Sequence, residues 1–335
     1  MRNLLIFNVL ILIISACSHS GNEKMIRFQG AAQGTYYDIS YFDNQERNFQ
    51  KEIDSLLDAF NFSVSVYEPN SIISKINRDE TDTEVDGWFI TVFNKAYEVA
   101  EATDGYFDFS VGPLVNAWGF GFSDRLHLDS NTIDSLLKLV GYRNFKLQNN
   151  RIIKAVPGAQ IDFNAIAKGY AVDVVAQFIE SKGVRAYLVD IGGEVIAHGR
   201  KPSGKLWKVG VEKPSEDQNS SRELKAIVEL ENMAIATSGN YRRFYVEDGV
   251  RYSHTIDPFT GYPVRHSLLS ASVLAKDCMT ADAYATAFMV MGNEKTIEFL
   301  KTRKDLEAFL IYSENGEELQ TWISEGFRSK IVERK

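Results

Sequence analysis

The sequence predicts an α+β fold in which a mostly antiparallel sheet is covered by packed helices. Short strand-like runs follow one another between residues 226 and 256 with turns between them, which favours antiparallel pairing. Other segments carry apolar residues at helical spacing, and no repeat of the solenoid type is visible. With 335 residues, of which 44% are hydrophobic and 24% charged, the chain can bury a substantial core.

The helices are predicted from apolar stripes that recur every three to four residues. In residues 49–60, Ile53, Leu56, Leu57 and Phe60 form such a stripe. The same criterion predicts the remaining helices at residues 71–77, 88–103, 131–140, 165–180, 279–291 and 296–303.

The strands are predicted from runs of β-branched and aromatic residues between turns. Residues 63–67 alternate as a strand would, and residues 160–163 read as a strand that leads into the helix at 165–180. Residues 213–222 are polar and predict an exposed loop. The other predicted strands are residues 25–28, 36–41, 145–147, 152–154, 185–191, 195–198, 207–211, 226–230, 233–237, 243–246, 251–256, 269–275, 308–312 and 319–323.

The N-terminus resembles a bacterial lipoprotein signal. Residues 4–14 form an almost unbroken apolar run that is too short to span a bilayer and has the length of a signal-peptide core. Ser15 and Ala16 precede Cys17, and cleavage there would leave a diacylated cysteine, a stable membrane anchor. The alternative is a secretory signal with a coincidental cysteine.

These features predict three parts and a location. We expect a signal peptide at residues 1–16, a polar tether at 17–26 and one globular domain at 27–330. The expected location is the bacterial cell membrane, with the protein lipid-anchored on the periplasmic or extracytoplasmic side.

The other cysteine, Cys278, precedes an apolar helical pattern and is predicted to be a core residue. The formal charge of −8 and the lack of a long basic run argue against nucleic acid as a partner.

Residues 161–170 are the first candidate site. Asp162 and Lys168 lie at a predicted strand-to-helix corner, where free backbone amides and the helix dipole favour a phosphate or carboxylate. The alternative is that Asp162 caps the helix and the Lys168 stem covers apolar surface while its charge stays in water.

Two further clusters are candidate sites. Asp282 and Thr286 are four residues apart on a predicted helix, so their oxygens face the same way and suit Mg²⁺. The alternative is an Asp that caps a helix and a Thr that packs. His254 lies three residues before Asp257 and could serve as a general base, or it could be a structural histidine. The aromatic, glycine-broken segment at residues 106–120 could be core or one wall of a pocket for a flat heterocycle.

Taken together, seven motifs closely resemble those of the ApbE family, the FAD:protein FMN transferases. The resemblance covers about residues 28 to 325, with every motif in family order. The motifs are Gly34-Thr35, Tyr106-Phe-Asp-Phe-Ser-Val-Gly-Pro-Leu-Val, Asp162-Phe-Asn-Ala-Ile-Ala-Lys-Gly-Tyr, Ile191-Gly-Gly-Glu, Ala236-Thr-Ser-Gly, His254-Thr-Ile-Asp-Pro-Phe-Thr-Gly and Thr280-Ala-Asp-Ala-Tyr-Ala-Thr-Ala.

The resemblance implies an ApbE-like, T-fold-like architecture with an FAD pocket between subregions. It implies Mg²⁺-dependent cleavage of FAD, with FMN joined through a phosphoester to a Thr or Ser of a target protein and AMP released. His254 would be the catalytic base, and the metal would be held by Asp282, Thr286 and the carbonyl of Ala165. The implied FAD contacts are Gln33, Tyr67, Tyr106, Phe107, Asp108, Asp162, Lys168 and Ile256.

The sequence departs from some members at Gln33, where they have Met, and at Lys168, where they have Glu; nucleotide contacts there can differ. The family's acceptors are membrane redox subunits, which predicts such a partner here. Two alternatives stay open at this point: an FAD pyrophosphatase that uses water in place of the protein hydroxyl, and a flavin-binding lipoprotein without chemistry.

Overall fold

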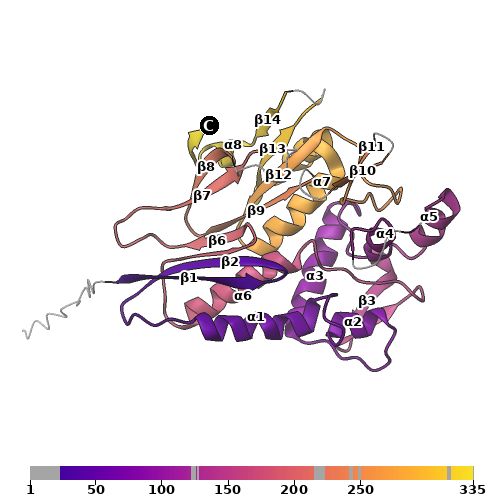
Figure 1. Ribbon diagram of the computed structural model, residues 1–335, viewed down its shortest axis with the longest axis horizontal. Coiled ribbons are helices and arrows are strands. Elements are labelled where there is room, and N and C mark those ends of the chain that lie inside the picture. The colour runs from indigo at the N-terminus through magenta and orange to yellow at the C-terminus, as the bar shows by residue number, and fades with distance from the viewer. Residues whose placement is uncertain are drawn as a thin grey trace, which may run out of the picture.

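The computed structural model describes residues 23–121, 126, 128–214, 223–240, 244–247, 250–314 and 318–334. Its centre is an eight-stranded sheet in the order β1-β2-β5-β6-β9-β12-β13-β14, and every neighbouring pair is antiparallel (Figure 1). These strands are β1 (Lys24–Ala32), β2 (Thr35–Asp43), β5 (Tyr187–Ile191), β6 (Glu194–His198), β9 (Met233–Gly239), β12 (Leu268–Ala275), β13 (Glu307–Tyr312) and β14 (Gln320–Ile323).

Helices pack on one face of this sheet and form the main core. Buried residues of β2, β5 and β12 meet apolar stripes of the helices there, so the helical periodicity of the sequence is used for burial. The helices are α1 (Gln50–Val64), α2 (Ile72–Asn77), α3 (Gly87–Ala102), α6 (Ala167–Ser181) and α7 (Cys278–Leu300).

A smaller three-stranded sheet covers the opposite face. It has the order β15-β8-β7, from β7 (Trp207–Glu212), β8 (Leu224–Leu230) and β15 (Ile331–Arg334), with α8 (Glu325–Arg328) beside it. Along β13, Ala308 and Leu310 enter the helix-side core while Phe309 and Ile311 enter the second core, as the two-residue strand period requires. The domain continues past the predicted boundary at 330, because β15 pairs with β8.

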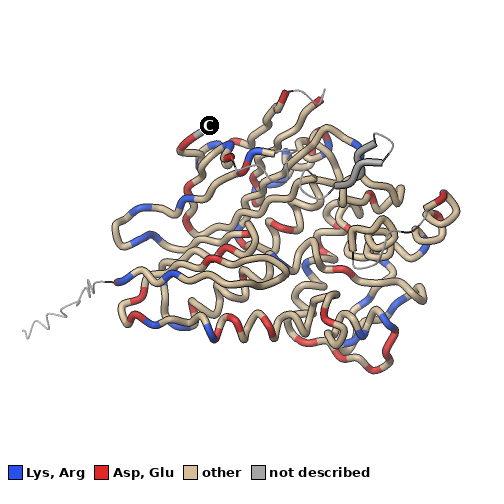
Figure 2. The backbone as a smooth tube through the Cα atoms, viewed as in Figure 1, with Lys and Arg blue, Asp and Glu red and all other residues tan. Residues whose placement is uncertain are grey.

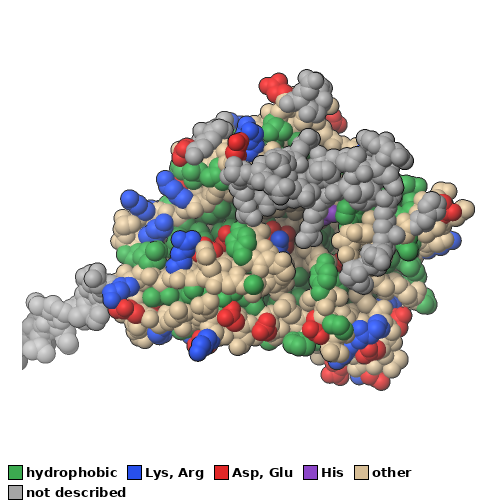
Figure 3. All heavy atoms as spheres, viewed as in Figure 1, with side chains coloured by type: hydrophobic (Ala, Val, Ile, Leu, Met, Phe, Trp, Pro, Cys, Tyr) green, Lys and Arg blue, Asp and Glu red, His purple; other side chains and the backbone are tan. Residues whose placement is uncertain are grey.

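A third cluster lies at one end of the molecule. Leu114 and Trp118 from the α4 region pack with Ile133 of α5 and with Ile256. Figure 3 shows hydrophobic side chains gathered on this side, beside α5. The elements here and nearby are α4 (Gly112–Ala117), α5 (Ser130–Leu137), the short helix η1 (Tyr142–Asn144), and the hairpins β3 (Phe145–Gln148) with β4 (Arg151–Lys154) and β10 (Phe244–Glu247) with β11 (Val250–Ser253).

The predicted α+β class and antiparallel pairing are confirmed, with local differences. Residues 63–67 are not a strand: α1 continues through Val64, because Ser63 and Val64 are buried and the Ser63 hydroxyl donates to Asp86 Oδ1 at 2.7 Å. Residues 160–163 form no strand and join no described sheet. The two helices predicted at 279–291 and 296–303 form α7, with a kink at Gly292 (φ +79°).

Charged residues of both signs are interspersed over the elements (Figure 2). Within the described ranges, no helix is both long and apolar enough to cross a membrane. Cys17, the signal-like segment and most of the loop predicted at 213–222 lie outside the described residues.

Candidate active site

The site is built where the N-terminal turns of α6 and α7 cross. The backbone N–H of Gly169 on α6 donates to Asp282 Oδ2 on α7 at 2.9 Å. A Cβ at Gly169 would lie 2.4 Å from the carbonyl oxygen of Cys278 and 2.7 Å from Asp282 Cβ. Only glycine therefore allows the two helices to approach closely enough for this hydrogen bond.

A buried carboxylate fixes the start of α7. Asp173 of α6 accepts hydrogen bonds from the N–H groups of Cys278 and Met279, both at 2.8 Å, while the side chain of Asp277 caps the helix by accepting from Thr280 N–H. Burial raises the pKa of Asp173 to about 7, although these two N–H groups favour the charged form. Asp173 was not among the predicted site residues. The feature of the sequence that could have identified it is an acidic residue within an apolar helical stretch. Cys278 is buried, as predicted, and burial raises the pKa of its thiol.

A charge cluster lies beside Asp282. Lys168 Nζ is 2.7 Å from Glu194 Oε2, and Glu194, at the start of β6, is 4% exposed. Burial and the nearby Asp282 raise the pKa of Glu194 to about 8, and Lys168 opposes this rise. Burial also raises the pKa of Asp282, against the effects of Lys168 and the Gly169 N–H. Two buried acids thus share one cation, which leaves excess negative charge when both are ionised.

This arrangement fits a hard divalent cation. Asp282 is 5% exposed, and among the described residues its carboxylate accepts one hydrogen bond, from Gly169. One turn further along α7, the Thr286 hydroxyl lies 3.2 Å from the Ser238 hydroxyl of β9. No described group of three or more His, Cys, Asp or Glu could hold a metal, so the remaining ligands here would be hydroxyl, carbonyl and water oxygens. Mg²⁺ accepts such a set.

The corner before α6 is held by side chains rather than by a sheet. Asn77 of α2 clamps Ile161 by accepting from its N–H and donating to its carbonyl, both at 2.8 Å. Asp162 N–H donates to the Phe109 carbonyl at 2.7 Å, and Asp162 Oδ1 accepts from Asn164 N–H at 2.7 Å. Burial raises the pKa of Asp162. Ala165 lies in this turn, two residues before α6, so these hydrogen bonds set the position of the Ala165 carbonyl.

The aromatic segment at 106–110 divides between core and surface. Asp108 holds its own loop, since it accepts from Ser110 N–H at 2.8 Å and from Tyr142 N–H at 2.9 Å. The Phe107 ring is 2% exposed and packs in the main core, so it does not stack on a ligand as the sequence suggested, and only its backbone could reach one. Tyr106 is partly exposed, and its hydroxyl accepts from Lys295 Nζ at 2.6 Å.

The other predicted FAD contacts lie on separate elements. Gln33 (φ +53°) and Gly34 (φ +69°) form the two-residue turn between β1 and β2, and Gln33 Nε2 donates to Asn61 Oδ1 at 2.7 Å. Tyr67 follows α1 and is 58% exposed. Ile256 is 4% exposed, so its side chain belongs to the third cluster and, as with Phe107, only its backbone could reach a ligand.

His254 directly follows β11 and is partly buried. Its ring centroid lies 6.4 Å from that of Phe120 at 68°, an edge-on contact that orients the imidazole. The protein therefore presents a partly exposed imidazole on one element and a buried carboxylate with a lysine on others.

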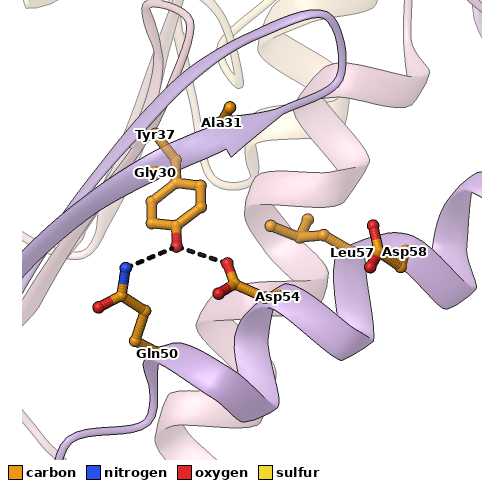
Figure 4. Close-up of a pocket in the computed structure, with 7 residues that line it drawn as sticks. All are labelled: Gly30, Ala31, Tyr37, Gln50, Asp54, Leu57 and Asp58. Carbon is orange, nitrogen blue, oxygen red and sulfur yellow. Dashed lines mark hydrogen bonds between the residues drawn. The ribbon is translucent and has the colours of Figure 1, made fainter.

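A pocket of about 280 Å³ lies apart from these residues, between β1 and α1 (Figure 4). The Tyr37 ring occupies the space that a Cβ of Gly30, its cross-strand partner, would fill. Tyr37 Oη donates to Asp54 Oδ1 at 2.5 Å and accepts from Gln50 Nε2 at 3.3 Å. Burial and Asp54 raise the pKa of Tyr37 to about 12. These contacts tie the hairpin that carries Gln33 to α1.

Comparison with known proteins places the fold and the motifs in one family. The sequence profile of the ApbE family matches residues 33–310. The chain belongs to the ApbE family. A Vibrio cholerae serotype O1 protein named FAD:protein FMN transferase is 36% identical over 94% of this chain and 96% of its own length. A Haemophilus influenzae protein of the same name is 34% identical over 97% of this chain and 96% of its length.

A solved ApbE structure confirms the architecture. The flavin transferase ApbE from Vibrio cholerae superposes with a TM-score of 0.82 at 35% identity, covering 92% of this chain and 99% of that one. The ApbE-like fold expected from the sequence is therefore confirmed. The individual roles assigned to His254, Lys168 and the other ApbE motif residues stay predictions.

Proposed function

We propose that this chain transfers FMN from FAD to a Thr or Ser hydroxyl of a target protein and releases AMP, with Mg²⁺ at Asp282, Thr286 and the carbonyl of Ala165. The names of the relatives support the reaction. The observation that carries the proposal is the buried Asp282 carboxylate, set one helical turn from Thr286 and close to the Lys168–Glu194 pair. That is a site for a cation and a pyrophosphate together.

The reaction balances without a further reagent. The acceptor oxygen forms a bond to the FMN phosphorus, the bond from that phosphorus to the bridging oxygen breaks, and AMP leaves with the bridging oxygen. His254 takes the hydroxyl proton, a step worth typically ~10²–10⁴-fold. Bound Mg²⁺ supplies neutralisation of the pyrophosphate charge. Lys168 and the N-terminus of α6 bind and orient the phosphates.

The test uses the chain without its first 17 residues, incubated with FAD, Mg²⁺ and a bacterial membrane fraction. Flavin fluorescence of protein bands after denaturing electrophoresis identifies the acceptor, and chromatography measures AMP. We expect a fluorescent band whose amount matches the AMP released. AMP with free FMN and no labelled band would indicate a pyrophosphatase, and bound but intact FAD would indicate a binding protein.

Two variants assign the roles. His254→Ala is expected to bind FAD and to lose transfer by about 10²-fold or more, because the base is gone. Asp282→Ala is expected to need much more Mg²⁺ for half-maximal rate, with the fold monitored by circular dichroism. Transfer by His254→Ala at the rate of the unsubstituted enzyme would remove this histidine from the base role.

The location is a separate proposal. Residues 4–14 and the sequence Ser15-Ala16-Cys17 support lipid attachment at Cys17 and a place on the outer side of the cell membrane, facing a membrane redox subunit as acceptor. Labelling of bacteria with an alkyne fatty acid tests it: the full chain should take up the label and Cys17→Ser should not. Equal labelling of both would contradict the proposal.

A further inference from the structure

The turn that follows His254 exposes two aromatic side chains. Phe259 is 55% exposed and Tyr262 is 41% exposed. Large aromatic rings left in water at neighbouring positions are typical of binding surfaces, whereas single exposed apolar residues are ordinary.

The turn is rigid, so these rings are held in place. Asp257 Oδ1 accepts from Phe259 N–H at 2.8 Å, and Asp257 N–H donates to the Tyr262 carbonyl at 2.9 Å. Gly261 has φ +75°, and a Cβ there would lie 2.7 Å from the Ile133 side chain of α5, so the turn sits directly on the third cluster. Trp118 Nε1 donates to the Gly261 carbonyl at 2.8 Å.

Each exposed ring also packs against an aromatic ring beneath it. The Phe259 and Tyr106 centroids are 5.1 Å apart at 71°, and those of Tyr262 and Trp118 are 5.8 Å apart at 56°. The inner side of each ring is therefore occupied and the outer side meets water. A partner that covers the outer sides loses little ring entropy, because the rings are already ordered.

We propose that Phe259 and Tyr262 are the docking surface for the polypeptide segment that carries the acceptor hydroxyl. The inference rests on the proposed FMN transfer, which requires a protein chain to reach His254. The five residues from His254 to Phe259 span at most about 18 Å, so a segment with its hydroxyl at His254 reaches Phe259 within about five residues. The hydrogen bond from Asp257 N–H to the Tyr262 carbonyl keeps Tyr262 beside Asp257, three residues from His254. We expect that segment to bring apolar side chains to the rings.

A positive charge beside the rings further restricts which acceptor segments can bind there. Lys295 is exposed, and its ammonium lies 4.7 Å from the Tyr106 ring centroid, next to Phe259. A basic side chain of the acceptor would be repelled there, so the flanking segment is expected to be neutral or acidic.

The experiment measures transfer to the purified protein that is labelled in the membrane-fraction test, with acceptor and FAD concentrations varied separately. Phe259→Ser and Tyr262→Ser are each expected to raise KM for the acceptor about fivefold or more, as for truncation of an aromatic anchor. At saturating acceptor kcat should be kept, and KM for FAD should stay within about twofold. Tyr262→Phe keeps the ring and should behave as the unsubstituted enzyme. Met25→Ser is the control: Met25 is 56% exposed on β1, and β1 lies away from α4 and α5 (Figure 1).

Tyr262→Ser is the decisive variant, because the Tyr262 ring packs against Trp118, whereas the Phe259 ring packs against Tyr106, a predicted FAD contact. A selective rise in its acceptor KM supports the proposal. An unchanged acceptor KM, or a rise in the FAD KM instead, overturns it and in the second case assigns the rings to the flavin site. If the unsubstituted enzyme labels no protein at all, the proposed transfer itself fails, and that result is recognised before any variant is made.

Discussion

Replacing Gly169 by alanine tests how the site is assembled. The new methyl group would lie 2.4 Å from the Cys278 carbonyl oxygen and 2.7 Å from Asp282 Cβ. Neither atom is the end of a flexible side chain, so α6 and α7 must separate. The hydrogen bond from Gly169 N–H to Asp282 Oδ2 would lengthen with them.

The magnitude follows from three opposing contributions. Overpacking costs about 1–3 kcal/mol, and a weakened hydrogen bond to a buried carboxylate costs about 1–2 kcal/mol. Alanine in place of glycine within a helix returns about 1 kcal/mol. We expect the free energy of unfolding to fall by about 1–4 kcal/mol. For 335 residues at about 2.1 cal/mol/K each, this lowers Tm by about 1–6 °C.

The assay is a thermal melt paired with transfer rates over a range of Mg²⁺ concentrations. Gly87→Ala is the matched control: Gly87 is the first residue of α3, and a Cβ there meets nothing within 4 Å. It should be neutral or stabilising by up to about 1 kcal/mol. Gly169→Ala should be less stable and require more Mg²⁺. A Gly169→Ala protein as stable and active as Gly87→Ala would refute the close crossing of α6 and α7.

Three further changes have defined outcomes. Asp173→Ala leaves the N–H groups of Cys278 and Met279 without their acceptor, so the free energy of unfolding measured by urea titration should fall by about 2–4 kcal/mol. Asp173→Asn should lose less. No loss in Asp173→Ala would mean that other groups accept hydrogen bonds from the start of α7. Because the folded pKa of Asp173 is about 7 against an ordinary 3.8, the folded state keeps a proton that the unfolded chain releases; its contribution to stability is present below about pH 4 and lost as the pH rises to 7. Melts of the unsubstituted protein should therefore fall relative to Asp173→Asn between these pH values, and a constant difference would contradict the shift. Tyr37→Phe removes the hydrogen bonds to Asp54 and Gln50, so the free energy of unfolding should fall by about 1 kcal/mol. FAD binding should also weaken, because these bonds hold the hairpin that carries Gln33. Unchanged FAD binding would mean that this hairpin does not contribute to the FAD site.

Much of the fold could be predicted, because most elements carry their own periodicity. Residues 49–60 and 88–103 have apolar stripes, and both are helices that bury those stripes in the main core. The errors have tertiary causes. Residues 63–67 alternate in polarity, but burial of Ser63 against Asp86 extends the helix instead. β15 was missed because four residues at the chain end carry little pattern, and the pairing with β8 is what makes them a strand.

The candidate site was predictable only for groups whose chemistry is visible in one stretch. Asp282 and Thr286 share a helix face, so their spacing in the sequence already shows that they can act together. The partners that complete the site come from other elements: Asp173 caps α7 from α6, and Glu194 meets Lys168 from β6. A sequence pattern does not show how close two such elements lie in the folded protein. A resemblance can name the residues of a site, but it cannot show which of them also support the structure, as Asp108 does.

The pair of Lys168 and Glu194 shows why that difference affects function. The sequence presents Lys168 as a free cation for a phosphate, yet its ammonium lies 2.7 Å from a carboxylate that is 4% exposed. A buried, ionised Glu194 without this partner would be costly, so Lys168 stabilises the Glu194 carboxylate. Under the proposed function, a bound pyrophosphate would share Lys168 with Glu194. Burial and Asp282 raise the pKa of Glu194 to about 8, so at neutral pH the protonated acid would compete less for the lysine charge. The acid beside the lysine would then affect phosphate affinity together with the lysine itself.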